Sequence, residues 1–228
     1  MSVSELRFQG RPADLPAGTV VPVAPPRPGW YFPAKRAIDV VLSLAILGAT
    51  APVVAGAMAG IVLVTGGNPL YRQERVGRGG RRFQMWKLRT MVHDAHAMLP
   101  ELRKFNEADG PVFKMRDDPR LHGLGALLRR TSIDELPNFV NVLTGEMSIV
   151  GPRPPLPEEV AHYDAYALRR LAVKPGITCL WQISGRSQLA FEDWMALDNA
   201  YIDGWSPWGD LAIIARTIPA VLRGVGAH

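Results

Sequence analysis

Residues 129–137 read Arg129-Arg130-Thr131-Ser132-Ile133-Asp134-Glu135-Leu136-Pro137, with two adjacent arginines ahead of two adjacent carboxylates. Ser132 and Glu135 have the S-x-x-E spacing of a capping box, which predicts that a helix begins here and ends at Thr144-Gly145. Acidic residues are ordinary in a first helical turn, because they complement its positive end. The arginines and the helix N-terminus also favour ionised carboxylates, so Asp134 or Glu135 could act as a nucleophile or hold a divalent cation.

An apolar run without a single charge extends from Val40 to Val64 and is long enough to cross a bilayer as a helix. A buried helix of a soluble protein is the alternative. Pro52 lies in the middle of the run and predicts a kink, where Thr50 could help to satisfy freed backbone groups. Basic residues flank both ends, and the positive-inside rule therefore puts both ends in the cytosol. We predict a re-entrant membrane helix over residues 34–67.

The rest of the chain divides around this helix. Residues 1–33 are rich in proline and lack apolar periodicity, which predicts a disordered tail. We expect residues 68–228 to form a cytosolic or interfacial catalytic domain. The formal net charge of +5 suits an anionic partner: phosphate, nucleic acid or an acidic membrane surface. The lone cysteine, Cys179, cannot form an intrachain disulfide and favours a reducing compartment.

Arginines and glycines are concentrated between residues 70 and 91. Phe83, Met85 and Leu88 predict short strands around a glycine-rich turn, whose arginines and backbone amides suit phosphate or anionic lipid headgroups. A short buried strand at residues 146–150 then leads to Arg153, which prolines on both sides hold in one direction. A rigidly presented guanidinium suits phosphate recognition, although a proline-rich connector with an exposed arginine is equally compatible.

Shorter patterns complete the expected elements. They predict helices at 121–130, 158–173 and 191–205, a turn at 174–178, and a strand at 180–183. Arg186 follows this strand as a second glycine-positioned arginine. Residues 211–222 are apolar apart from Arg216, with Arg223 directly after them, and either lie in the membrane interface or pack on the core.

Several motifs occur in a fixed order over about residues 33–226. They are Lys35-Arg36-x-x-Asp39 before the apolar run, Lys87-Leu88-Arg89-Thr90-Met91, Ser132-Ile133-Asp134-Glu135-Leu136-Pro137, Met147-Ser148-Ile149-Val150-Gly151-Pro152-Arg153-Pro154, Lys174-Pro175-Gly176-Ile177-Thr178 and Gln182-Ile183-Ser184-Gly185-Arg186. Together they closely resemble the bacterial sugar transferases, which are monotopic polyprenyl-phosphate phosphoglycosyl transferases that begin exopolysaccharide or other glycan assembly. The expected fold is α+β: the re-entrant membrane helix, amphipathic interfacial helices, and a small sheet carrying the active site.

The resemblance implies a reaction and its place in the cell. A nucleoside diphosphate sugar, expected to be a UDP-hexose, would give its sugar-1-phosphate to undecaprenyl phosphate at the cytosolic face of the bacterial inner membrane. Asp134 would attack the phosphorus nearer the sugar and form a covalent phosphosugar-aspartate, which the polyprenyl phosphate then attacks. Mg²⁺ is expected at Asp134 and Glu135, and Glu135 would assist there or accept a proton.

The same resemblance assigns binding and membrane residues. The candidates for phosphate or nucleotide contacts are Lys87, Arg89, Arg129, Arg153 and Arg186. Pro52 matches the helix-breaking proline of the family's membrane helix, but Ala51 stands where relatives often carry serine. Inner-membrane lipids are the expected surroundings and nucleic acid is not an expected partner. A homodimer is left open, because no heptad pattern is present.

Two other functions compete with this one. The first is a membrane-associated glycosyltransferase that moves the sugar alone, without a covalent intermediate; such enzymes often use a D-x-D metal motif, and Asp117-Asp118 is not one. The second is a non-enzymatic basic module that binds anionic lipid or nucleic acid. The glycosyltransferase would release nucleoside diphosphate, whereas a phosphoglycosyl transferase would release nucleoside monophosphate. Asp134→Asn would abolish turnover in a phosphoglycosyl transferase but would be harmless in a binding module.

Overall fold

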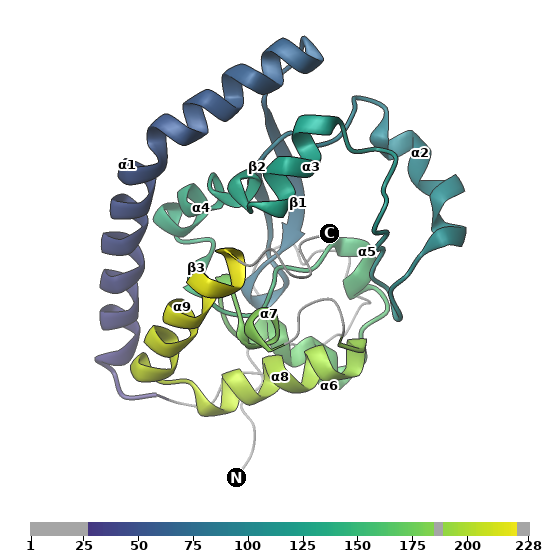
Figure 1. Ribbon diagram of the computed structural model, residues 1–228. Helices are drawn as coiled ribbons and strands as arrows, with labels where there is room; N and C mark the ends of the chain where they lie inside the picture. The colour runs from purple at the N-terminus through teal and green to yellow at the C-terminus, as the bar shows by residue number, and fades with distance from the viewer. Residues whose placement is uncertain (1–26, 185–188, 223–228) are drawn as a thin grey trace.

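The computed structural model describes residues 27–184 and 189–222 of the chain. Figure 1 shows a long helix, α1 (Tyr31–Thr65), running along one side of a body of short helices and two small sheets. Each of these sheets has two strands. The expectation of a mixed fold with mostly helices and little sheet is therefore confirmed.

Helix α1 contains the apolar run and is long and apolar enough, by length and composition, to cross a membrane. Only 6% of its most apolar window is buried inside the protein. Figure 1 shows the helix bending partway along, and its hydrogen-bonded course continues through Pro52. The Thr50 hydroxyl donates to the Ile46 carbonyl at 2.7 Å. It therefore does not serve the carbonyl of Gly48, which loses its usual partner because Pro52 has no amide hydrogen.

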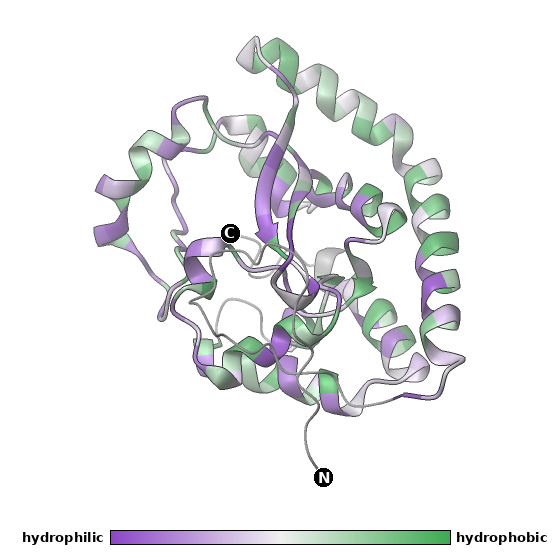
Figure 2. Cartoon of the chain, turned by 180° about the vertical axis from the view of Figure 1, so that it is seen from behind, coloured by the Kyte–Doolittle hydropathy of each residue, from purple (hydrophilic) through white to green (hydrophobic). Residues whose placement is uncertain are grey.

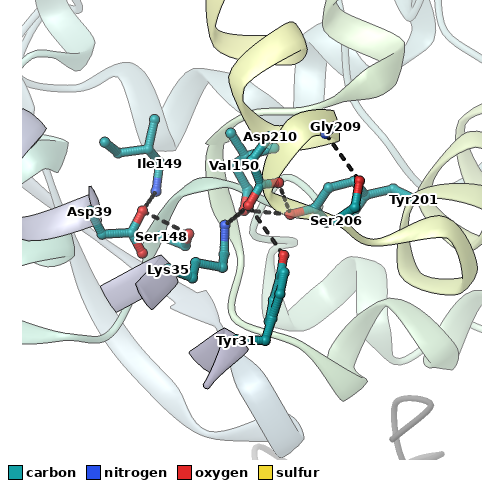
Figure 3. Close-up of polar contacts among 10 residues, drawn as sticks. All are labelled: Tyr31, Lys35, Asp39, Ser148, Ile149, Val150, Tyr201, Ser206, Gly209 and Asp210. Carbon is teal, nitrogen blue, oxygen red and sulfur yellow. Dashed lines mark hydrogen bonds and ion pairs between the residues drawn. The ribbon is translucent and has the colours of Figure 1, made fainter. Parts of the chain in front are cut away.

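The first half of α1 is held to the body by charged side chains (Figure 3). Lys35 forms an ion pair of 2.7 Å with Asp210 in α9 (Pro207–Leu222). Asp39 accepts hydrogen bonds from the Ser148 hydroxyl and the Ile149 amide in strand β3 (Ser148–Val150). Figure 2 shows hydrophilic segments in this first half and mostly apolar ones beyond the bend. The first half thus adds polar contacts to its apolar packing, whereas the second half contacts the body through apolar residues such as Ile61, which clusters with Leu88 and Leu128.

A β-hairpin follows α1, with strands β1 (Leu70–Val76) and β2 (Arg82–Leu88) antiparallel to each other. The turn is a short 3₁₀ helix, η1 (Arg78–Gly80), and the glycines at 79 and 80 have φ of 67° and 76°. These are left-handed values that glycine adopts without strain. The predicted strands around a glycine turn are confirmed.

The middle of the chain consists of short helices, one of which carries the carboxylate pair. These are α2 (Ala95–Leu102), η2 (Arg103–Phe105), α3 (Gly123–Arg130), η3 (Ile133–Glu135) and α4 (Asn138–Thr144). The side chain of Asn141, in α4, forms hydrogen bonds with the edge of β2 that does not pair with β1. It accepts from the Trp86 amide and donates to the Gln84 carbonyl. A buried backbone edge is thereby satisfied, and α4 is fixed against the hairpin.

The C-terminal third contains the largest departures from the predicted elements. It consists of α5 (Pro157–Val160), α6 (Ala165–Leu168), η4 (Arg169–Ala172), β4 (Gly176–Thr178), α7 (Leu180–Ile183), α8 (Phe191–Gly204) and α9. The helical stretch predicted at 158–173 is helical but interrupted, because Asp164 accepts the Ala167 amide and starts a new helix in its middle. The strand predicted at 180–183 is a helical turn, in which Trp181 stacks on Trp194 of α8.

The predicted turn at 174–178 contains strand β4, which pairs in parallel with β3. The pairing depends on a close approach of two glycine backbones. A Cβ on Gly176 would lie 2.1 Å from the Gly151 nitrogen. The turn residues thus belong to a strand because only glycine allows this contact, which propensity alone does not reveal.

Helix α9 packs on the core, which is one of the two expectations for residues 211–222. Ile213 is buried in the main core, which also contains Phe139, Met147 and Tyr201. Trp208 and Ile218 are 80% and 60% exposed. The helix therefore packs on the core along one side and presents apolar side chains on the other.

Candidate active site

The carboxylate pair lies in η3, directly after a backbone turn at Ser132. Ser132 has φ of 56°, the left-handed region that non-glycine residues seldom adopt. Its side chain caps no helix, and the α-helix starts only at Asn138. The predicted capping box is thus wrong, because the Glu135 carboxylate is bound to Lys87 instead of the backbone. The predicted end of the helix at Gly145 is confirmed, since this glycine has φ of 87°.

Asp134 and Glu135 are neighbours with opposite electrostatics. Asp134 is buried, and this burial raises its pKa to about 6, against the opposing effect of the Lys87 charge. Burial alone would also raise the pKa of Glu135, but Lys87 and Arg153 outweigh it and hold that pKa at about 2. The Lys87 ammonium lies 2.7 Å from a Glu135 carboxylate oxygen. Glu135 is thus fixed as an ion, and Asp134 is the carboxylate that changes charge near neutral pH.

Arg129 lies beside this pair at the end of α3. Its guanidinium donates to the Thr90 hydroxyl at 3.1 Å, just after β2. Burial lowers the pKa of Arg129, and the nearby charge of Asp134 opposes that effect. The charges of Arg129 and Asp134 are therefore close enough to influence each other, and the role of Arg129 as a phosphate or nucleotide contact stays a prediction.

Arg153 approaches the same pair from the segment after β3. It is only partly buried, and its charge lowers the pKa of Glu135. Within the described residues, no hydrogen bond or ion pair engages its guanidinium. Lys87, Arg129 and Arg153 are thus brought together around the carboxylates, from three segments far apart in the sequence.

Arg89 is not part of this cluster. Its guanidinium donates to the Asn68 carbonyl at 2.8 Å and lies over the Tyr71 ring. These contacts hold it at the junction between α1 and the hairpin, so the structure gives it no direct contact with the pair. Arg186 lies outside the described residues.

Two cations near the pair were not singled out from the sequence. Arg75 is buried, and both Arg153 and Glu135 influence its pKa, which burial lowers to about 10. Lys114 is close enough to Arg153 that, after burial, this arginine is the main cause of its lowered pKa. Arg75 belongs to the dense arginine pattern of the hairpin, and nothing in that pattern marks it as the buried member.

The donors present fit a magnesium ion that is shared with a substrate. Among the described residues, no group of three or more His, Cys, Asp or Glu side chains is close enough to bind a metal alone. Mg²⁺ commonly uses one or two protein carboxylates together with substrate phosphates and water. Asp134 and Glu135 meet that requirement, and Lys87, Arg129 and Arg153 would face the charge of the phosphates.

The model of one protein family, described as "Bacterial sugar transferase", matches residues 30–224. The galactosyl transferase CpsE of Streptococcus agalactiae is 44% identical over 85% of this chain, which spans 43% of that relative's length. The exopolysaccharide production protein ExoY of Sinorhizobium fredii is 39% identical, over 86% of this chain and 88% of its own. A UDP-glucose:undecaprenyl-phosphate glucose-1-phosphate transferase of Caulobacter vibrioides is 37% identical, over 97% and 84%.

These matches include both the apolar helix and the segments that carry the carboxylate pair and its cations. The resemblance that the motifs indicated is therefore confirmed over most of the length of the chain. The chain belongs to the bacterial sugar transferase family.

Proposed function

We propose that this chain is a phosphoglycosyl transferase, which moves sugar-1-phosphate from a nucleoside diphosphate sugar to undecaprenyl phosphate and so begins the synthesis of a polysaccharide. The observation that carries the proposal is Asp134, a buried carboxylate next to the Lys87–Glu135 ion pair and within the electrostatic influence of Arg129. The Caulobacter relative's printed name describes a transfer of this kind from UDP-glucose, which supports a UDP-hexose as donor.

Asp134 is the proposed nucleophile. Its carboxylate oxygen attacks the phosphorus nearer the sugar, the bond from that phosphorus to the nucleoside phosphate breaks, and nucleoside monophosphate leaves. An oxygen of undecaprenyl phosphate then attacks the phosphorus of the aspartyl intermediate, and the bond to Asp134 breaks. Covalent catalysis of this kind divides one difficult displacement into two easier ones.

The surrounding charges fit both steps. Arg129 and Arg153 offset the negative charge that the phosphoryl oxygens carry in each transition state. Lys87 holds Glu135 in the ionised form, beside the nucleophile. Mg²⁺ held by Asp134, Glu135 and the diphosphate would supply further charge neutralisation at the phosphoryl oxygens. Arg186 and Arg89 remain proposed phosphate or nucleotide contacts, and Arg89 lies at the junction between α1 and the hairpin.

The membrane arrangement is proposed from the same elements. Helix α1 enters the inner membrane from the cytosolic side, bends and returns, so that the active site lies at the cytosolic face among the lipid headgroups. The uncharged composition of residues 40–64 and the basic residues on both sides of the helix support this arrangement. The lipid phosphate would then meet Asp134 at the interface.

The test follows the released nucleotide. Purified protein in detergent receives Mg²⁺, undecaprenyl phosphate and UDP-glucose or UDP-galactose labelled in the sugar. We expect release of UMP and transfer of the label to lipid. Asp134→Asn should abolish both, whereas Asp117→Asn, which changes an exposed carboxylate, should abolish neither.

Release of UDP in place of UMP would contradict the proposal and identify a transferase that moves the sugar alone. If no nucleotide sugar in a panel is consumed, while the protein still binds anionic vesicles, the enzymatic proposal fails. Label retained covalently on the protein without acceptor lipid, and released by hydroxylamine as expected of an acyl phosphate, would support the aspartyl intermediate directly.

A further inference from the structure

The segment Pro152–Pro155 carries Arg153 and offers four consecutive backbone carbonyls. Each of the four accepts a hydrogen bond: from the Gly176 amide at 2.9 Å, Arg170 Nη2 at 3.1 Å, Arg75 Nη1 at 2.9 Å and the Val76 amide at 3.0 Å, in chain order. Three of the four residues are prolines, which have no amide hydrogen and therefore cannot donate a backbone hydrogen bond to a neighbouring strand. The donors therefore come from other elements, and two of them are arginine side chains.

Arg170 lies in η4 and is 6% exposed. Its guanidinium forms an ion pair of 2.8 Å with the buried Asp198 of α8, and donates to the Tyr163 hydroxyl at 2.7 Å. Nη2, the nitrogen that pairs with Asp198, also donates to the Arg153 carbonyl at 3.1 Å, whereas Nε has no hydrogen-bond partner among the described residues. The planar fork of arginine can serve three partners in fixed directions, which a lysine ammonium does not reproduce.

Arg75, in strand β1, donates to the next carbonyl, that of Pro154. It is also 6% exposed, and Gln73 accepts from two of its nitrogens at 3.1 Å and 2.6 Å. Burying two guanidinium groups carries a desolvation penalty that an apolar core would avoid. The carbonyl contacts give these buried charges a specific use, since together they fix the direction in which the segment presents its own arginine.

We propose that Arg170 and Arg75 are positioning residues, which hold the carbonyls of Arg153 and Pro154 so that the Arg153 guanidinium faces the carboxylate pair without being bound by it. The inference rests on the proposed function in taking Arg153 as a phosphate contact. Neither Arg170 nor Arg75 needs to touch the substrate. A displacement of about 1 Å in such a contact can reduce a rate about 100-fold.

A double-mutant cycle tests whether Arg170 acts through Arg153. We expect Arg170→Met to lower kcat/KM for the donor about 10- to 100-fold, and to lower it less than about threefold further when Arg153 is already alanine. Equal losses in both backgrounds would overturn the inference and leave Arg170 a structural residue. Arg169→Met is the matched control, because Arg169 occupies the same turn but pairs with the exposed Asp203; it should retain wild-type kcat/KM.

Removing Arg170 alone leaves Asp198 buried without its partner, which endangers folding. Arg170→Met is therefore repeated together with Asp198→Asn, which removes both charges and should give the same non-additivity with Arg153→Ala. Arg170→Lys keeps the charge pair but not the fork, so we expect it to fold normally and still lose most of the kcat/KM.

Hydrogen exchange provides a readout that is independent of turnover. The amides of Val76 and Gly176 are bound to the two ends of the segment, at Pro155 and Pro152. Peptides containing them should exchange faster in the Arg170→Met/Asp198→Asn protein than in Arg169→Met. Unchanged exchange would overturn the inference. If exchange accelerates but Arg153→Ala alone leaves kcat/KM unchanged, it is the proposed role of Arg153 that has failed, and the segment is held for another reason.

Discussion

Asp134 and Glu135 are adjacent in the chain, yet the structure separates their protonation behaviour. Glu135 is bound to Lys87 and remains ionised, whereas Asp134 is buried with a pKa near 6. A pair of titratable groups driven apart in this way is typical of sites where each has its own role. The sequence motif showed two carboxylates but not which of them the fold would bury.

The ionised form of Asp134 should lower the free energy of unfolding of the protein. Because burial raises its pKa from 3.8 to about 6, the folded protein prefers the protonated side chain, and stability falls as pH rises through this window. We expect Asp134→Asn to raise the free energy of unfolding by about 1–3 kcal/mol at pH 8, with the gain vanishing near pH 4. Thermal unfolding in detergent measures it, with Asp117→Asn as control; a lower stability at pH 8 would contradict this account.

The same pKa predicts the acid limit of the first chemical step. Only the ionised Asp134 is nucleophilic, so the single-turnover rate of UMP release should fall about tenfold per pH unit below about pH 6. The rate is measured with donor far below saturation, so that its pH dependence reports the free enzyme, and without acceptor lipid, so that lipid binding does not interfere. A rate independent of pH between 4.5 and 7 would exclude Asp134 as the group that titrates.

At the scale of elements, α3 positions Arg129 through close packing on the backbone after β2. A Cβ on Gly125 would fall 2.0 Å from the Thr90 carbonyl oxygen, whereas Gly123, two residues earlier in the same helix, has open space. Thr90 also receives the hydrogen bond from Arg129. The helix, the strand end and the arginine therefore form one unit, in which a single methyl group has no room.

Gly125→Ala should displace α3 and with it Arg129. We expect a loss of about 2–4 kcal/mol in the free energy of unfolding and a lower kcat/KM, because the backbone must shift to accept the side chain. Gly123→Ala is the matched control and should be close to wild type in both. Equal behaviour of the two variants, measured by thermal unfolding and UMP release, would show that α3 is not held in this way.

The elements also show what sequence reasoning can and cannot reach. The hairpin, α3, α8 and the cations Lys87, Arg129 and Arg153 followed from local patterns and ordered motifs. The capping box failed because Glu135 has a better partner in Lys87, which lies 48 residues away. Strand β4 was missed because it depends on two glycines meeting across the sheet. Arg75 was missed because alternation along a strand does not reveal which arginine becomes buried. These errors share one cause: a tertiary contact overrides the local signal.

At the scale of the whole molecule, α1 is joined to the catalytic body by paired charges as well as by apolar packing. Lys35 and Asp210 are both about nine-tenths buried, and Tyr201 also donates to Asp210 at 2.8 Å. Arg36 donates to the carbonyls of Val142 and Leu143 at the end of α4, where a cation complements the negative helix end. Helix α1 is therefore fixed to α4 and α9 by side chains near its N-terminus.

Removing one partner of the Lys35–Asp210 ion pair should destabilise the protein more than removing both partners. Asp210→Asn leaves Lys35 buried without a counter-charge, and we expect a loss of about 3–5 kcal/mol in the free energy of unfolding. Adding Lys35→Met should recover part of that loss, since no unpaired charge remains. Thermal unfolding of the two single variants and the double variant in detergent measures the coupling. Strictly additive losses would mean that the pair contributes nothing specific.

The long reach of these contacts has a consequence for how the protein is made. Lys35 finds its partner 175 residues later, in the last described helix, and Arg36 finds its acceptors about 106 residues later. During synthesis α1 is therefore complete long before the groups that compensate its charges exist. A ribosome adds about 5–20 residues per second, so the helix waits for roughly ten seconds or longer with an unpaired lysine. Its docking is a late event of biogenesis, completed only when α9 has left the ribosome.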